Sequence, residues 1–163
     1  MQVELQNYTP LSTATHAMGQ CYGKALKEDA LVRAVSSGHL SLLEHTMVSF
    51  DIEMSQKCLA QITRHRHLSF TVKSTRGANF GDATWFDSTE HPEITNDMGQ
   101  LMNKLIENQI LEYRRLVEAG VPYQVASYVL PLATNVTMTV SGSLRTWMEY
   151  LPKRLCKRAS TEH

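Results

Sequence analysis

A dense run of basic residues is the part of this sequence best able to do chemistry. Arg64, Arg66, Lys73 and Arg76 lie within thirteen residues, and two histidines stand among them. The stretch 54–81 contains no aspartate or glutamate. The planar guanidinium group of arginine forms paired hydrogen bonds with phosphate oxygens and with the edges of uracil-like rings. The segment therefore indicates a site for an anionic, nucleotide-like ligand.

Other interpretations of this segment stay open. One is a solvated basic surface, and another is an RNA-binding segment. Only Phe70 and Phe80 offer aromatic rings nearby, and sixteen basic residues balance sixteen acidic ones, so no overall field attracts a polyanion. A metal site would use four histidines whose spacing matches no standard zinc pattern: His39, His45, His65 and His67. We therefore expect neither a metal nor a nucleic-acid partner.

The order Arg64-His65-Arg66, seven residues, then Ser74 resembles the signature of the flavin-dependent thymidylate synthases. Segments on both sides are similar to that family and follow in the same order along the chain. They are the N-terminal VELQNYTP and residues 38–45, 120–122, 129–132 and 141–151. The resemblance extends over nearly the whole chain, so it implies one domain of this family spanning residues 1–163.

The resemblance implies an enzyme that makes dTMP by reductive methylation of dUMP. In the family, methylenetetrahydrofolate is the carbon donor, FAD is the flavin cofactor and NADPH is the reductant. The resemblance also implies a homotetramer whose active sites are shared between subunits. Two alternatives stay open. One is a diverged relative that modifies another pyrimidine nucleotide, for example by hydroxymethylation, and the other is a protein that binds flavin or nucleotide without turnover.

The family's site residues carry over onto the matching positions of this sequence. The catalytic residues that the resemblance implies are Arg64, Ser74 and Arg154, with Arg158 as the alternative to Arg154 if the register differs. The implied contacts to dUMP are Gln61, Arg64, Ser74, Thr75, Arg76 and Arg154. The implied contacts to FAD are His39, Ser41, Glu44, Arg64, His65, Arg66, His67, Ser143 and Arg145, the last two from another subunit.

Three departures from the family pattern concern this site. Thr71 and Val72 replace an Asn-Glu pair that the family usually carries before the motif serine. Ser127 stands where many members have a phosphate-binding arginine. We expect these two changes to weaken dUMP binding by roughly tenfold or more each, or to alter the choice of base. The sequence also stops at His163, within a helix that relatives usually continue, and we expect this to remove part of the pocket.

Hydrophobic periodicity predicts the elements that must position these residues. Alternation with a period of two predicts strands at 3–5, 48–54 and 136–140 and an extended segment at 67–74. Helical spacing and capping residues predict helices near 12–22, 26–37, 55–64, 98–117, 122–129 and 143–151, a turn at 41–44 and a loop at 77–95. Pro152 should interrupt the chain before a new basic helix at 153–163. The predicted class is α+β: a small antiparallel or mixed sheet with a long helix and a helical C-terminal part, like the thymidylate synthase-complementing proteins.

Composition favours a cytoplasmic protein. The three cysteines, Cys21, Cys58 and Cys156, are odd in number and widely spaced, which argues against a disulfide framework. No apolar run approaches the roughly 18 residues of a membrane span, and the N-terminus lacks the pattern of a signal peptide.

Overall fold

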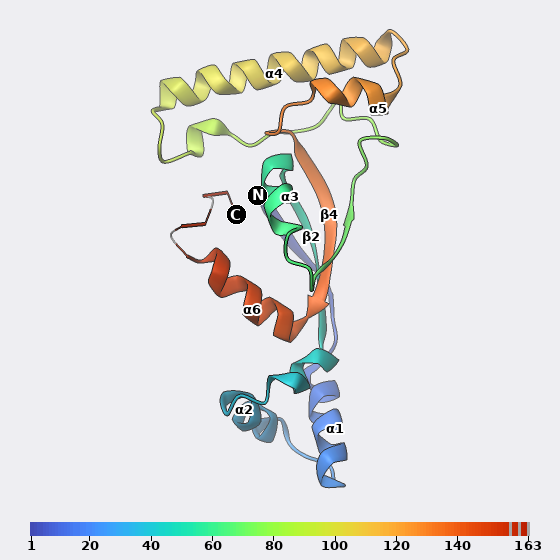
Figure 1. Ribbon diagram of the computed structural model, residues 1–163, viewed down its shortest axis with the longest axis vertical. Coiled ribbons are helices and arrows are strands. Elements are labelled where there is room, and N and C mark those ends of the chain that lie inside the picture. Colours follow the sequence, from blue (N-terminus) through green and yellow to red (C-terminus); the bar gives the residue numbers. More distant parts are fainter. Residues whose placement is uncertain (157, 160, 163) are drawn as a thin grey trace.

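A four-stranded antiparallel sheet connects the two ends of an elongated molecule (Figure 1). The computed structural model describes residues 1–156, 158–159 and 161–162. Its strands are β1 (Gln2–Tyr8), β2 (Met47–Ser55), β3 (Ser69–Val72) and β4 (Asn135–Ser143). They lie in the order β1-β2-β4-β3, so β4, the last strand in the sequence, is central. The predicted α+β class is confirmed, and all three strand pairs are antiparallel.

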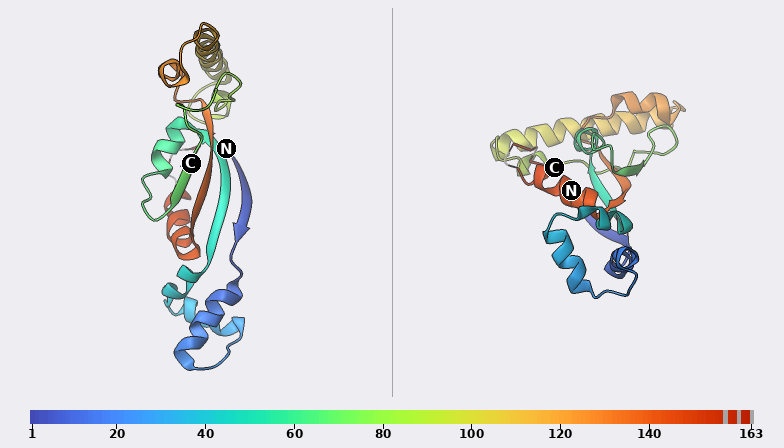
Figure 2. Two further views of the ribbon diagram at one scale, coloured as in Figure 1. Left: turned by 90° about the vertical axis from the view of Figure 1, so that its right-hand side faces the viewer. Right: turned by 60° about the horizontal axis from the view of Figure 1, so that its bottom comes forward.

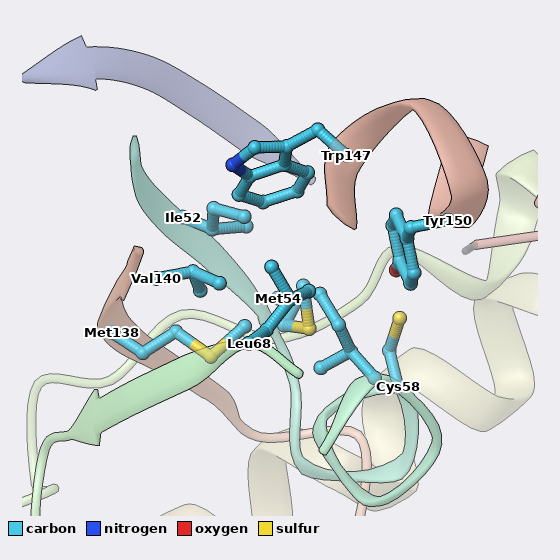
Figure 3. Packing of buried hydrophobic residues seen from close by; sticks show 9 residues of the cluster. Ile52, Met54, Cys58, Leu68, Met138, Val140, Trp147 and Tyr150 are labelled. Carbon is cyan, nitrogen blue, oxygen red and sulfur yellow. The ribbon is translucent and has the colours of Figure 1, made fainter. Parts of the chain in front are cut away.

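The register of the sheet follows the alternation in the sequence. Ile52 pairs with Met138 and Phe50 with Val140, so apolar side chains of neighbouring strands share one face. The opposite face is polar, and there Thr139 donates a hydrogen bond of 2.5 Å to Asp51. The apolar face is covered by α3 (Gln56–Ile62) and α6 (Leu144–Arg154). Figure 3 shows side chains of both helices packed over the buried residues of β2 and β4.

Both covering helices begin directly at the end of a central strand, and a serine caps each one. The Ser55 hydroxyl accepts a hydrogen bond from the Cys58 N–H at the start of α3. The Ser143 hydroxyl accepts one from the Thr146 N–H at the start of α6. A serine at this position satisfies a backbone donor that the helix leaves free and so sets where the helix starts. The two strand-to-helix junctions therefore fold both helices back over the same face of the sheet.

The remaining helices occupy the two ends of the molecule, as Figure 2 shows. At one end lie α1 (Leu11–Tyr22), α2 (Glu28–Ser36) and the 3₁₀ helix η1 (Leu40–His45). At the other end lie η2 (Ser88–Glu90), α4 (Asn96–Glu118), α5 (Tyr123–Ala126) and η3 (Ser127–Val129). A second core under α4 contains Phe80, Tyr113, Ala126 and Val136. No helix in the described part of the chain combines the length and apolar character needed to cross a membrane.

Three local predictions are wrong. Pro152 lies inside α6, which continues to Arg154. A proline in the last turn of a helix removes only one hydrogen bond at the frayed end, so the helix tolerates it. The described residues after α6 form turns, where helix 153–163 was predicted, and positions 157, 160 and 163 lie outside the described residues. The predicted loop 77–95 is confirmed apart from the short η2 and an isolated bridge between Trp85 and Thr134. Ser41 does not cap η1, which begins after His39 without a side-chain cap.

Candidate functional site

The Arg-His-Arg segment forms a tight turn between α3 and β3. Three successive backbone hydrogen bonds shape it: Arg64 N–H to the Gln61 carbonyl, His65 N–H to the Ile62 carbonyl, and Leu68 N–H to the His65 carbonyl. Ile62 and Leu68 anchor its two ends in the core, where they are 2% and 5% exposed. We call residues 63–68 the motif turn. Its anchored ends present the side chains of Arg64 and Arg66 to solvent.

His65, in the middle of the motif turn, packs against α6. Its ring centroid lies 5.2 Å from that of Tyr150, and the Arg154 guanidinium carbon lies 5.6 Å from the same tyrosine ring. Burial lowers the pKa of His65, and the positive charges of Lys153, His67 and Arg154 lower it further, while Glu149 acts in the opposite sense. The surroundings of His65 are therefore electropositive, and its neutral form is favoured.

A cleft of about 400 Å³ lies beside the motif turn, between η1, the end of β4 and α6. Four of the predicted FAD-contacting residues line it together: Glu44, His67, Ser143 and Arg145. Arg145 bridges two carboxylates, at 3.2 Å from Glu44 and 2.9 Å from Glu149. Glu44 therefore serves as an ion-pair partner in place of the capping role that its spacing from Ser41 predicts.

Glu149 is a residue of this cleft that the sequence prediction missed. Its hydrogen bond with Arg145, and then the positive charges of Arg145, Lys153 and His67, hold its pKa below the usual value despite some desolvation. The available signal was its spacing: Glu149 follows Arg145 by four residues on a predicted helix, which places both on one face. Arg145 and Glu149 therefore form part of one charge network along the cleft.

Gly142 brings the end of β4 close to the motif turn. A Cβ atom added at this position would lie 2.5 Å from Leu68 Cδ2, so any other residue would require the leucine that anchors the turn to shift. The next residue in β4, Ser143, lines the cleft together with His67, which precedes Leu68. The close approach at Gly142 therefore brings Ser143 and His67 together as two walls of the cleft.

The Ser74 segment lies at the other end of β3 from the motif turn. Its hydroxyl accepts the Arg76 N–H at 3.2 Å, and its carbonyl accepts the N–H groups of Gly77 and Ala78, which makes a compact turn. Ser74, Thr75 and Arg76 are not among the residues that line the cleft. Within one chain, Ser74, Thr75 and Arg76 therefore lie apart from the motif turn, although the two groups are close together in the sequence.

The other predicted residues are divided between these regions. Gln61 is half-buried in the last turn of α3, and His39 and Ser41 are exposed at the start of η1. Arg154 ends α6, and Arg158 lies exposed beyond it. Of the residues that depart from the family pattern, Thr71 is exposed in β3, Val72 packs against both cores, and Ser127 donates to the Gln124 carbonyl.

The charges of the site fit an anionic ligand. Among the described residues, neither Arg64 nor Arg66 forms an ion pair. Two exposed guanidinium groups beside an electropositive turn can take the oxygens of a phosphate or the edge of a polar ring. Among all the residues that the structure describes, no three His, Cys, Asp or Glu side chains lie close enough together to hold a metal ion.

Comparisons with known proteins agree with this arrangement. A family model described as thymidylate synthase complementing protein matches residues 4–163. The flavin-dependent thymidylate synthase of Thermococcus onnurineus is 31% identical over 99% of this chain and 74% of its own length. That of Haloarcula marismortui is 28% identical over 83% of this chain and 66% of its own. A probable flavin-dependent thymidylate synthase of Mycobacterium phage L5 is 31% identical over 85% of this chain and 62% of its own.

Solved structures show the same fold. Two crystal structures of thymidylate synthase X from Helicobacter pylori, both with FAD and dUMP, superpose with a TM-score of 0.78. They are 22% and 23% identical to this chain, and each match covers 99% of it and 88% of the solved chain. Against the three relatives above, the chain spans 62% to 74% of the length.

Proposed function

Because this chain belongs to the thymidylate synthase complementing protein family, the flavin-dependent thymidylate synthases, we propose that it converts dUMP to dTMP. The carbon donor in this proposal is methylenetetrahydrofolate, and the reductant is NADPH. FAD, when bound, supplies the hydride, so the work of the protein is binding, orientation and electrostatics.

The observation that carries the proposal is the cleft beside the motif turn. Glu44, His67 and the junction that carries Ser143 and Arg145 are three separate segments of one chain that converge on it, although the resemblance implies that the last two residues come from another subunit. We propose that they hold FAD together with His39, Ser41, Arg64, His65 and Arg66. The cleft of about 400 Å³ receives part of the cofactor, and the exposed arginines of the motif turn suit its phosphate groups.

We call residues 74–78 the Ser74 turn. We propose that dUMP binds between the motif turn and a Ser74 turn. Arg64 and Arg154, with Gln61, take the uracil ring, where a cation stabilises negative charge developing on the ring oxygens. Ser74, Thr75 and Arg76 take the ribose and phosphate. Their position at the far end of β3 supports a site in which the Ser74 turn of one subunit faces the motif turn of another.

This shared site leads us to propose a homotetramer. An apolar stripe on α4 with helical spacing supports subunit packing, because each of its members is 47% to 61% exposed: Met98, Leu101, Met102 and Leu105. Light scattering measures the mass of the oligomer directly.

Mixing the Arg76→Ala protein with the Arg145→Gln protein tests whether sites are shared between subunits. In a mixed oligomer, some sites combine the intact Arg145 of one subunit with the intact Arg76 of another. Recovery of activity on mixing supports shared sites, and no recovery argues for sites built from one chain.

The main test uses the visible absorption spectrum. Purified protein is loaded with FAD, desalted and scanned with and without dUMP. We expect retained flavin whose spectrum shifts when dUMP is added, followed by release of the uracil C5 proton when folate is present. Retained flavin and bound dUMP without proton release would refute the methyl transfer, and loss of all flavin would refute the cofactor assignment.

A second candidate is a related enzyme acting on another pyrimidine nucleotide. Val72 favours it, because its side chain packs against both cores at a position where the family usually has a carboxylate. A comparison of dCMP with dUMP in the spectral titration separates the two. Preference for dUMP supports thymidylate synthesis, and preference for dCMP supports the alternative.

We also propose a cytoplasmic location. Cys21, Cys58 and Cys156 are free thiols, which suits a reducing compartment. Fractionation of cells that produce the protein tests this directly.

A further inference from the structure

A continuous series of aromatic contacts joins the sheet to the motif turn. Phe50 of β2 meets Trp147 edge to face at 5.0 Å between ring centroids. Trp147 meets Tyr150 at 5.8 Å, and Tyr150 meets His65 at 5.2 Å. The indole N–H of Trp147 donates to the Val48 carbonyl at 3.1 Å, which fixes the series to β2. Figure 3 shows Trp147 and Tyr150 projecting from α6 over the buried side chains of the sheet and α3.

Tyr150 is the branch point of this series. Its ring touches His65 on the motif turn, and the Arg154 guanidinium carbon lies 5.6 Å from the ring centroid. The residue is 5% exposed, so both contacts are made in a largely dry environment, where ring and cation–π interactions are strongest. One buried ring thus contacts a proposed FAD residue and a proposed uracil residue.

We propose that Tyr150 is a positioning residue that holds His65 and Arg154 at a fixed separation, and so aligns the flavin and uracil halves of the site. This inference rests on the proposed function for its catalytic consequence. Edge-to-face and cation–π contacts depend on the ring, and burial raises the pKa of the Tyr150 hydroxyl to about 12, so it stays protonated at neutral pH. Phenylalanine keeps the ring and therefore keeps both of these contacts.

The test compares Tyr150→Phe and Tyr150→Leu with Tyr113→Leu as a matched control. Tyr113 is also a buried tyrosine, but it belongs to the core under α4, away from the motif turn. We expect Tyr150→Leu to lower kcat/KM for dUMP by roughly ten- to thirtyfold beyond the loss in Tyr113→Leu, through both lost ring contacts. Tyr150→Phe should stay within about threefold of the wild type.

A second readout needs no ligand. Hydrogen exchange in the apo protein should show faster opening of amides 62–68 in Tyr150→Leu, with residues 136–140 unchanged. A Tyr113→Leu protein should not show this selective opening. If Tyr150→Leu does not fold, Tyr150→Met, which retains more of the side-chain volume, takes its place.

Two results would overturn the inference: equal damage from Tyr150→Phe and Tyr150→Leu, or no selective opening at 62–68. A wild-type protein without turnover would refute the proposed function. The exchange experiment would then still decide whether Tyr150 positions the motif turn.

Discussion

Replacing Gly142 by alanine tests whether close packing between β4 and the motif turn builds the cleft. The added methyl group would lie 2.5 Å from Leu68 Cδ2 and 3.7 Å from the Thr146 side chain. The backbone at Gly142 does not have a positive φ, so the conflict is one of space. Leu68 is 5% exposed in the main core and must move. Because His67 lines the cleft directly before it, the displacement should reach the FAD residues.

The expected cost follows from overpacking. An extra methyl group in a well-packed core costs about 1–3 kcal/mol. For a protein of this size each kcal/mol lowers Tm by about 2–4 °C, so Gly142→Ala should lower Tm by roughly 2–12 °C. FAD affinity should fall as well, because the displaced turn carries four proposed FAD contacts. Calorimetry and flavin fluorescence titration measure the two effects.

Three further variants make this prediction specific. Gly77→Ala is the control, because a Cβ there meets nothing within 4 Å and the free energy of unfolding should not fall. Leu68→Val removes the atom that clashes. The double variant Gly142→Ala, Leu68→Val should therefore lose less stability than the sum of the two single variants. A strictly additive double variant, or an unchanged Tm in Gly142→Ala, would refute the packing argument.

Three more predictions follow from the described contacts. Arg145→Gln should weaken FAD binding roughly tenfold, because it removes the guanidinium group that lines the cleft. The control Arg115→Gln, which breaks another exposed ion pair, should leave the dissociation constant for FAD unchanged in the same flavin titration. Equal dissociation constants for the two variants would contradict this prediction. Burial and nearby positive charge lower the pKa of His65, so the unfolded chain binds the proton more tightly and stability should fall as the pH drops through about 6.5. Thermal melts of His65→Gln should show a smaller loss between neutral and mildly acidic pH, and identical pH profiles would argue against it. Ser55→Ala removes the α3 cap and should lower the free energy of unfolding, measured in urea, by about 1 kcal/mol. Ser12→Ala, at an exposed position, should leave the free energy of unfolding unchanged. A loss below a few tenths of a kcal/mol in Ser55→Ala would show that the cap contributes little.

Much of the fold could be predicted from local patterns. The alternation around Ile52 and Met138 predicts the two central strands, and the structure pairs these two residues directly. Ser55 and Ser143 are predicted starts of helices, and both side chains cap them. Gly38 and Gly120 follow predicted helices and have φ values of 92° and 88°, which other residues rarely adopt. These signals lie within a few residues of the feature that they specify.

The parts that could not be predicted depend on contacts between distant segments. Glu44 and Arg145 are 101 residues apart, and no local pattern indicates that they pair. The role of Tyr150 appears only when α6 packs against the motif turn. The motif itself suggests that Arg64 and Ser74 lie together, but strand β3 separates them within one chain. Pro152 was misread because the rule against proline applies to the helix interior and Pro152 lies near the end of α6.

The position of β4 has a consequence for the order in which the protein can fold. This strand is made last, yet it pairs with both β2 and β3, and its partners in β2 lie about 90 residues earlier in the chain. A nascent chain that has emerged only to residue 134 can pair β1 with β2, but β3 has no strand to join. Pairing over such a separation is slow, because a long loop must close before any contact forms. Synthesis must therefore deliver residues 135–143 before the two turns at the ends of β3 can take up their native places.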